Sequence, residues 1–167
     1  TDLRFVRSSD DGGSNVDNDA FGALFTYRHG GHGFTGGYQH MRGDTGFAYV
    51  AGGDNALINL LQINDFGNED ERSWQASYEL DFSSFGAPGL FWKTAYVYGD
   101  NIDTGAGEGK EREFFNQVQY VVQSGPVKDL SLKLRNSIYR SNGALRDAGS
   151  PDLNEIRAFI EYPLSIL

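Results

Sequence analysis

The sequence predicts an all-β fold, an antiparallel transmembrane β-barrel. Three observations favour it: apolar and polar residues alternate with a period of two along most of the chain, short turns alternate with long connections, and Trp or Tyr lies near the ends of the apolar faces. Alternation places successive side chains on opposite faces of a strand. Aromatic girdles, with short turns at one end and long loops at the other, are typical of outer-membrane barrels.

The expected strands follow one another along the whole chain, which we treat as a single barrel domain, residues 1–167. The alternation is clearest where Trp74, Ala76 and Tyr78 share one face and Gln75 and Ser77 share the other. We expect about eight strands of the length that crosses a bilayer. In chain order, they cover residues 2–7, 21–28, 34–41, 73–82, 90–98, 114–123, 130–139 and 154–167.

Long and short connections alternate between these strands. Because every second connection of an antiparallel meander emerges at the same end, one end carries short turns and the other carries the long loops. The longest loop contains the apolar run 56–63, which predicts that it folds back as a short helix or strand on the outer mouth or into the lumen. The expected long external loops cover approximately residues 8–18, 43–71, 99–111 and 141–152.

Composition excludes several other classes. The 167 residues include 22 Gly and no Cys, and 14 basic against 23 acidic residues give a formal net charge of −9. The chain therefore has no disulfide or thiolate site, and its charge argues against nonspecific nucleic-acid binding. No apolar run approaches the length of a transmembrane helix. Thr1 opens directly into a strand without a signal sequence, so we expect a fragment of a larger barrel.

A soluble barrel or sandwich is the other all-β possibility. Its apolar face would point inward and its outer face would be charged. Here the face opposite the aromatic residues carries Ser, Gln, Lys, Arg and Glu, which suit the lining of a water-filled lumen. The membrane interpretation also requires a closed sheet, because lipid cannot satisfy an open strand edge.

Six segments, in order along the chain, resemble the OprD-type outer-membrane carboxylate channels of pseudomonads. They are AFGALFTYR at 20–28, GDTGFAY at 43–49, QINDF at 62–66, ERSWQ at 71–75, YGDNID at 98–103 and YPLSIL at 162–167. The resemblance implies a Gram-negative outer-membrane porin, an 18-stranded barrel with a narrow eyelet and a ladder of basic residues. This chain would be its carboxyl-terminal portion, although it lacks the usual terminal Phe.

The residues themselves also indicate such a ladder. If the short turns are periplasmic, inward-facing cations fall at different depths. Several moderate cationic sites attract carboxylates without trapping them. The predicted pore-lining residues, from the outside toward the periplasm, are Arg4 and Arg157, then Arg135 and Lys133, then Lys93, and Arg28 at the mouth.

The expected function is therefore a substrate-selective channel for passive uptake of small carboxylate-containing solutes. Its expected surroundings are outer-membrane lipid and lipopolysaccharide, as a monomer or weak oligomer. We expect no cofactor, no metal, no nucleic acid and no catalysis, since the histidines, at positions 29, 32 and 40, lie near a turn without a nucleophile elbow or further ligands.

A purely structural role is the alternative. Inward Lys and Arg would then pair with inward acids and hold together a small outer-membrane barrel by an internal salt-bridge network. The acids on that face are Glu79, Asp81, Glu113, Glu155 and Glu161. Other acids, Glu111 among them, are expected in the external loops.

Overall fold

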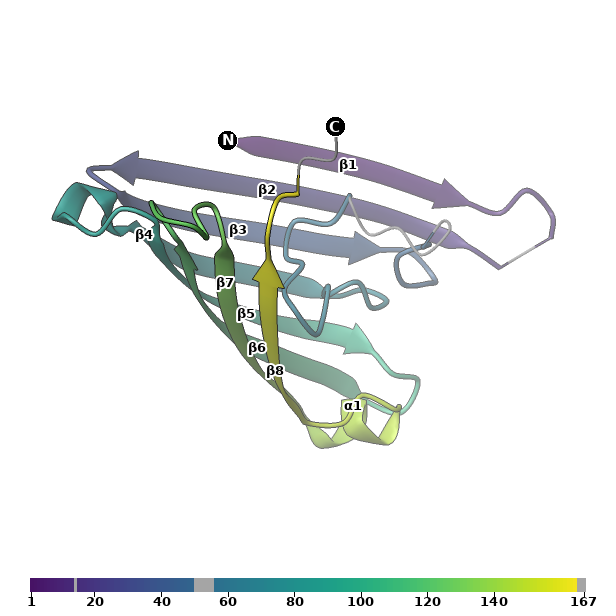
Figure 1. Cartoon of the computed structure of the whole chain (residues 1–167). Coiled ribbons are helices and arrows are strands. Elements are labelled where there is room, and N and C mark those ends of the chain that lie inside the picture. Colours follow the sequence, from purple (N-terminus) through teal and green to yellow (C-terminus); the bar gives the residue numbers. More distant parts are fainter. Residues whose placement is uncertain (14, 50–55, 165–167) are drawn as a thin grey trace.

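The structure is a computed structural model that describes residues 1–13, 15–49 and 56–164. Over these residues, eight strands form one antiparallel sheet in which each strand pairs with the next along the chain (Figure 1). The expected strands are confirmed. The parts of the predicted loops at 14 and 50–55, and the end of the predicted last strand at 165–167, lie outside the described residues.

Most strands begin and end within two residues of the expected positions, but β2 begins four residues and β6 six residues earlier, and β5 ends five residues later. They are β1 (Asp2–Ser9), β2 (Asp17–His29), β3 (His32–Arg42), β4 (Arg72–Asp81), β5 (Leu90–Asp103), β6 (Glu108–Val121), β7 (Ser131–Ser141) and β8 (Leu153–Glu161). A 3-10 turn, η1 (Phe82–Phe85), follows β4, and α1 (Gly143–Asp147) precedes β8. In the described part of the chain, no helix is both long and apolar enough to cross a membrane.

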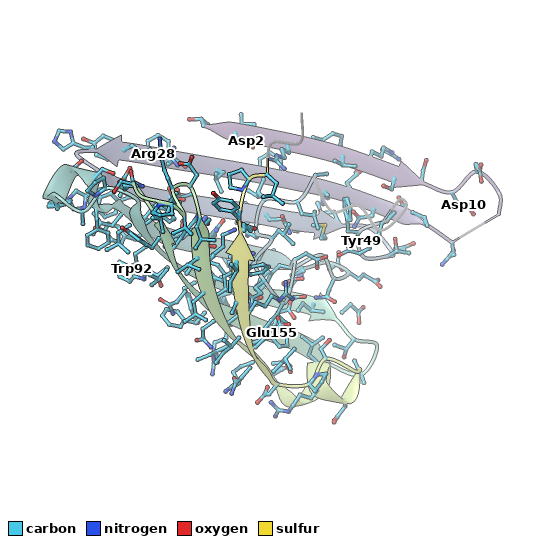
Figure 2. The ribbon with its side chains drawn as sticks, viewed as in Figure 1. Asp2, Asp10, Arg28, Tyr49, Trp92 and Glu155 are labelled. Carbon is cyan, nitrogen blue, oxygen red and sulfur yellow. The ribbon has the colours of Figure 1, made fainter. Side chains whose placement is uncertain are left out.

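The two faces of the sheet differ in chemistry. The pairing register places Phe25, Ala76, Tyr96 and Phe114 in one row of neighbours, and the three aromatic side chains in it are exposed. Trp92 lies on this same convex face (Figure 2). Polar side chains occupy the opposite, concave face, so the period of two separates an apolar wall from a polar one.

The sheet is strongly curved but open. Within the described residues, β1 and β8 are its two edges and do not pair with each other. This contradicts the alternative of a small closed barrel. Since lipid cannot satisfy the N–H and C=O groups of an edge, both edges need further strands beside them in a membrane.

Successive connections leave the sheet at alternate ends, but their lengths do not strictly alternate as expected, since the β5–β6 turn at 104–107 is shorter than the connections at 82–89 and 122–130. Arg28, beside the β2–β3 turn, and Asp10, in the β1–β2 connection, lie at opposite ends of the sheet (Figure 2). The expected loop 99–111 is different, because β5 and β6 continue through it as a hairpin around residues 104–107. A bulge between Gly99 and Ile102 shifts the register there.

The last strand is also shorter than expected. β8 ends at Glu161, and residues 162–164 are not in a strand. Pro163 has no N–H to donate to a neighbouring strand, which favours this end point.

Candidate functional site

A row of four basic side chains, one acid and one amide crosses the concave face. The register pairs Arg28 with Gly33, Gly33 with Glu79, Glu79 with Lys93, and so on to the last strand. We call this set the basic row, and its side chains are those of Arg28, Glu79, Lys93, Gln117, Arg135 and Arg157.

The basic row also changes height along the wall. Arg28 lies next to the last residue of β2, whereas Arg157 lies near the middle of β8. Strands of outer-membrane β-barrels are tilted by about 35–45°. A row of residues perpendicular to such strands therefore changes its depth from one strand to the next. One row can therefore present cations at several depths.

Most cations of the concave face have a carboxylate partner. Glu79 binds both Arg28, at 3.0 Å, and Lys93, at 3.3 Å. The distance from Arg157 Nη2 to Glu155 Oε2 is 2.8 Å. Lys133, one row nearer the short turns, lies 3.3 Å from Glu161. These pairs are partly hydrated, and such pairs contribute only about 0–1 kcal/mol to stability.

Arg135 differs from these cations. Its Nε donates to Gln117 Oε1 at 2.7 Å, and its guanidinium lies 5.2 Å from the centre of the Phe159 ring. Among the described residues, it has no carboxylate within ion-pair distance. An amide and an aromatic ring orient this cation without neutralising it.

Arg4 lies apart from the basic row. It binds Asp2 at 2.7 Å and donates to the carbonyl oxygen of Leu57 at 3.3 Å. All six predicted pore-lining cations thus lie on the concave face. Three of the acids expected beside them, Glu79, Glu155 and Glu161, form ion pairs with them. Asp81 instead accepts from the backbone N–H of Ser83, at the start of η1.

Residues 56–71, the inner loop, lie against this concave face (Figure 1). Gln39 Oε1 accepts from the N–H of Ile58 at 2.8 Å, and Asn59 donates to Ser73 at 2.8 Å. A Cβ on Gly22 would lie 3.0 Å from Ile58, so the sheet leaves room for this side chain. The loop folds back as predicted, but residues 56–71 contain no helix or strand.

Glu113 explains part of this irregular path. Its carboxylate accepts from the backbone N–H groups of Gln62 and Ile63 at 3.0 Å and of Asn64 at 2.8 Å, and from the Ser137 hydroxyl. Glu113 is fully buried. We expected Glu113 to pair with a cation, but it accepts from backbone N–H groups of the inner loop instead. Side-chain acceptors thus replace the regular hydrogen bonds that a helix or strand would supply.

A second carboxylate cluster holds the end of the inner loop. Asn68 donates to Glu71 at 2.9 Å and to Glu111 at 3.1 Å, and Tyr139 donates to Glu111. Burial, reinforced by the neighbouring Glu111 carboxylate, raises the pKa of Glu71 well above its usual range. Glu111, expected in an external loop, is buried on the concave face instead. The sequence carries no local signal for this cluster, because its members come from three separate segments.

A cavity of about 350 Å³ separates the inner loop from the basic row. Loop residues form one side of it, and the two cations facing it are Lys93 and Arg135. Its lining residues are Leu60, Leu61, Gln62, Glu79, Phe91, Lys93, Phe115, Gln117 and Arg135.

An open sheet with an apolar outer face, a polar inner face and an inserted loop is part of the wall of a transmembrane β-barrel. A family model described as outer membrane porin, OprD family, matches residues 1–166. The chain belongs to this family, whose members are outer-membrane proteins. The resemblance seen in the sequence is confirmed.

Known relatives agree with this assignment. Porin D of Pseudomonas aeruginosa is 38% identical over 99% of the chain, and the porin-like protein GalP of Pseudomonas putida is 36% identical over 99%. Among solved structures, Pseudomonas aeruginosa OpdQ has a TM-score of 0.88 at 51% identity over 95% of this chain and 41% of its own. For OccK10 (OpdN) of the same species, the TM-score is 0.90 at 41% identity, over 99% of this chain and 48% of its own. The chain spans 43% of Porin D and 39% of GalP.

Proposed function

We propose that the intact protein is a channel for passive uptake of small carboxylate-containing solutes, with the described residues forming part of its wall. The observation that carries this proposal is the basic row, and in particular Arg135, a cation beside the cavity without a carboxylate partner among the described residues. In a narrow aqueous path, such a charge attracts an anion. The long-connection end of the sheet would face the cell exterior.

The cavity supports a role for the inner loop in the same path. A solute passing between the loop and the wall would meet Lys93 and Arg135 on one side and Leu60 and Leu61 on the other. The cations would attract its carboxylate, while the leucines would contact its apolar part. The proposed conduction path comprises Arg4, Arg28, Lys93, Lys133, Arg135 and Arg157.

The ion pairs favour a second candidate role for some of these residues. Arg157 binds Glu155 and donates to the carbonyl oxygen of Gln62 at 3.2 Å, so it also connects β8 to the inner loop. Replacing Arg157 would then lower the stability of the protein more than its anion selectivity. Variants of single residues can therefore distinguish the structural role from the role in conduction.

Reversal potentials of the intact channel in planar bilayers, measured with the variants Lys133→Gln, Arg135→Gln and Arg157→Gln, test the proposal. We expect Arg135→Gln to lower the preference for anions most, because no neighbouring carboxylate already compensates its charge. The effect should weaken with salt, as the Debye length falls from about 10 Å at 0.1 M to about 3 Å at 1 M. Thermal unfolding of the same proteins provides the control. Unchanged selectivity in all three would contradict the proposed path.

A further inference from the structure

The outward face of the sheet changes from aromatic to basic at the long-connection end. The register places Trp74, Tyr98, Arg112 and Arg140 in one row of neighbours across four strands. These side chains share the convex face, because Arg112 lies between the buried Glu111 and Glu113, which face the concave side. We call Arg72, Lys110, Arg112 and Arg140 the basic patch.

Charge compensation within the basic patch is uneven. Arg72 lies 3.2 Å from Asp100, and Lys110 lies 3.3 Å from Glu108. The distance from Arg140 Nε to Asp152 Oδ2 is 3.8 Å, close to the limit for an ion pair. Arg112 has no carboxylate partner among the residues the structure describes. The patch therefore keeps one uncompensated cation beside a weakly compensated one.

The two arginines are also direct neighbours. Arg112 pairs with Arg140 across β6 and β7, and like charges directly opposite each other destabilise a sheet. Arg140 Nη1 donates to Asn154 Oδ1 at 2.8 Å and to the carbonyl oxygens of Tyr139, at 2.7 Å, and Leu153, at 3.3 Å, so its guanidinium is held toward β8 and leaves Arg112 the freer of the two. An anion bound at Arg112 would turn this repulsion into attraction. Arginine forms bidentate, charge-assisted hydrogen bonds with phosphate, which makes phosphate a suitable anion.

The neighbours of the patch place it at the membrane surface. Trp and Tyr rings gather at the boundary between the apolar band and the headgroups, and Tyr98 stands beside Arg112 in the same row. Long basic side chains beside such a ring extend toward the headgroups. With the long connections outside, these headgroups belong to the outer leaflet.

We propose that the basic patch binds the phosphate groups of a phosphorylated glycolipid of the outer leaflet, lipopolysaccharide. A permeating solute would meet the opposite face of the sheet, so this binding is separate from solute selection. The proposed lipid binding rests on the orientation given under the proposed function, with the long connections outside. It does not require that the channel prefers carboxylates.

Binding of purified lipopolysaccharide to the intact, detergent-solubilised channel tests the proposal. We expect each of Arg112→Gln and Arg140→Gln to weaken binding about five-fold, since one basic residue near an anionic surface contributes about 1 kcal/mol. Lys128→Gln removes the same charge in the connection between β6 and β7, at the short-turn end, and should bind like the wild type. The conductance of all three proteins should stay unchanged.

A second comparison needs no variant. The wild-type channel should bind dephosphorylated lipopolysaccharide more weakly, and an excess of inorganic phosphate should not displace the intact glycolipid, since one ion cannot match several phosphates on one lipid. Equal binding of the two glycolipids, or of the double variant Arg112→Gln, Arg140→Gln and the wild type, would overturn the proposal. The proposal would also be overturned if the double variant still bound lipopolysaccharide but changed from an oligomer to a monomer. That result would show that the basic patch is a contact between copies of the channel.

Discussion

Two glutamates of the concave face illustrate how surroundings decide what a carboxylate does. Glu79 is partly exposed and accepts from Arg28 and Lys93, so it lowers the positive charge of the basic row. Glu113 is buried and accepts from three backbone amides of the inner loop. Hydrogen bonds to a charged group contribute about 1.5–3 kcal/mol each. The position of the loop therefore depends on Glu113, as it does on Gln39, which makes four hydrogen bonds to loop backbone groups.

Replacing Glu113 by Gln should release the inner loop from the wall. The amide would keep one acceptor oxygen but present an NH₂ group to backbone donors, which leaves at least one of them unsatisfied. We expect hydrogen exchange at Gln62, Ile63 and Asn64 to become at least ten-fold faster, which corresponds to about 1.4 kcal/mol. Glu108→Gln, an exposed change on the same strand, is the control. Equal exchange in the two variants would show that Glu113 does not hold the loop.

Glu71 should make the attachment of the loop depend on pH. Because its pKa is raised in the folded protein, the folded state holds the proton more tightly than the unfolded chain does. The stability from this group is then present below the ordinary carboxyl pKa of about 4.3 and declines as pH rises through the raised value. Limited proteolysis of the inner loop should accelerate over that interval. Glu71→Gln, which cannot ionise, should flatten this dependence, and an unchanged pH profile would argue against it.

At the scale of a strand, the period of two predicted where most strands lie and which face each side chain takes. This succeeded because alternation is a local property of extended backbone. The path of the inner loop could not be predicted in the same way. Glu113 lies 49–51 residues from the amides it binds, and nothing near Gln62 or Asn64 in the sequence identifies that acceptor.

The prediction of a long loop was wrong in one segment that is rich in glycine and charged residues. Residues 99–111 have the appearance of a loop, yet pairing of Ile102 with Gly109 and of Asp103 with Glu108 extends the hairpin. The predicted basic residues share the concave face, because facing follows from alternation. Their partners depend on register, which the sequence did not supply; thus Asp81 and Glu113 were assigned to cations that they do not bind.

Two adjacent positions of β4 test the assignment of faces. Ala76 lies on the convex face and Ser77 on the concave face. The substitution Ala76→Arg should lower stability by about 2–4 kcal/mol if position 76 lies near the bilayer midplane, and it should impair assembly. Ser77→Arg should be tolerated, since water can hydrate its guanidinium. Heat stability on gels and the yield of membrane-inserted protein measure both effects, and equal sensitivity would contradict a lipid-facing convex surface.

At the scale of the whole chain, a net charge of −9 is compatible with the proposed anion-attracting path. Local field, rather than total charge, acts on a solute at a constriction. Acids such as Glu71 and Glu111 bind the inner loop or its neighbours, while Arg135 keeps its charge beside the cavity. The fold thus uses one face for two purposes: acids hold the loop and cations line the remaining space.

The most direct test of the proposed channel compares two solutes of nearly equal size that differ in charge. Liposomes containing the intact protein would be diluted into a small carboxylate or into its uncharged carboxamide, and the rate of swelling would be recorded. We predict faster entry of the carboxylate, with the advantage reduced in Arg135→Gln and at high salt. Equal rates for the two solutes in the wild type, or faster entry of the amide, would contradict a carboxylate-selective channel.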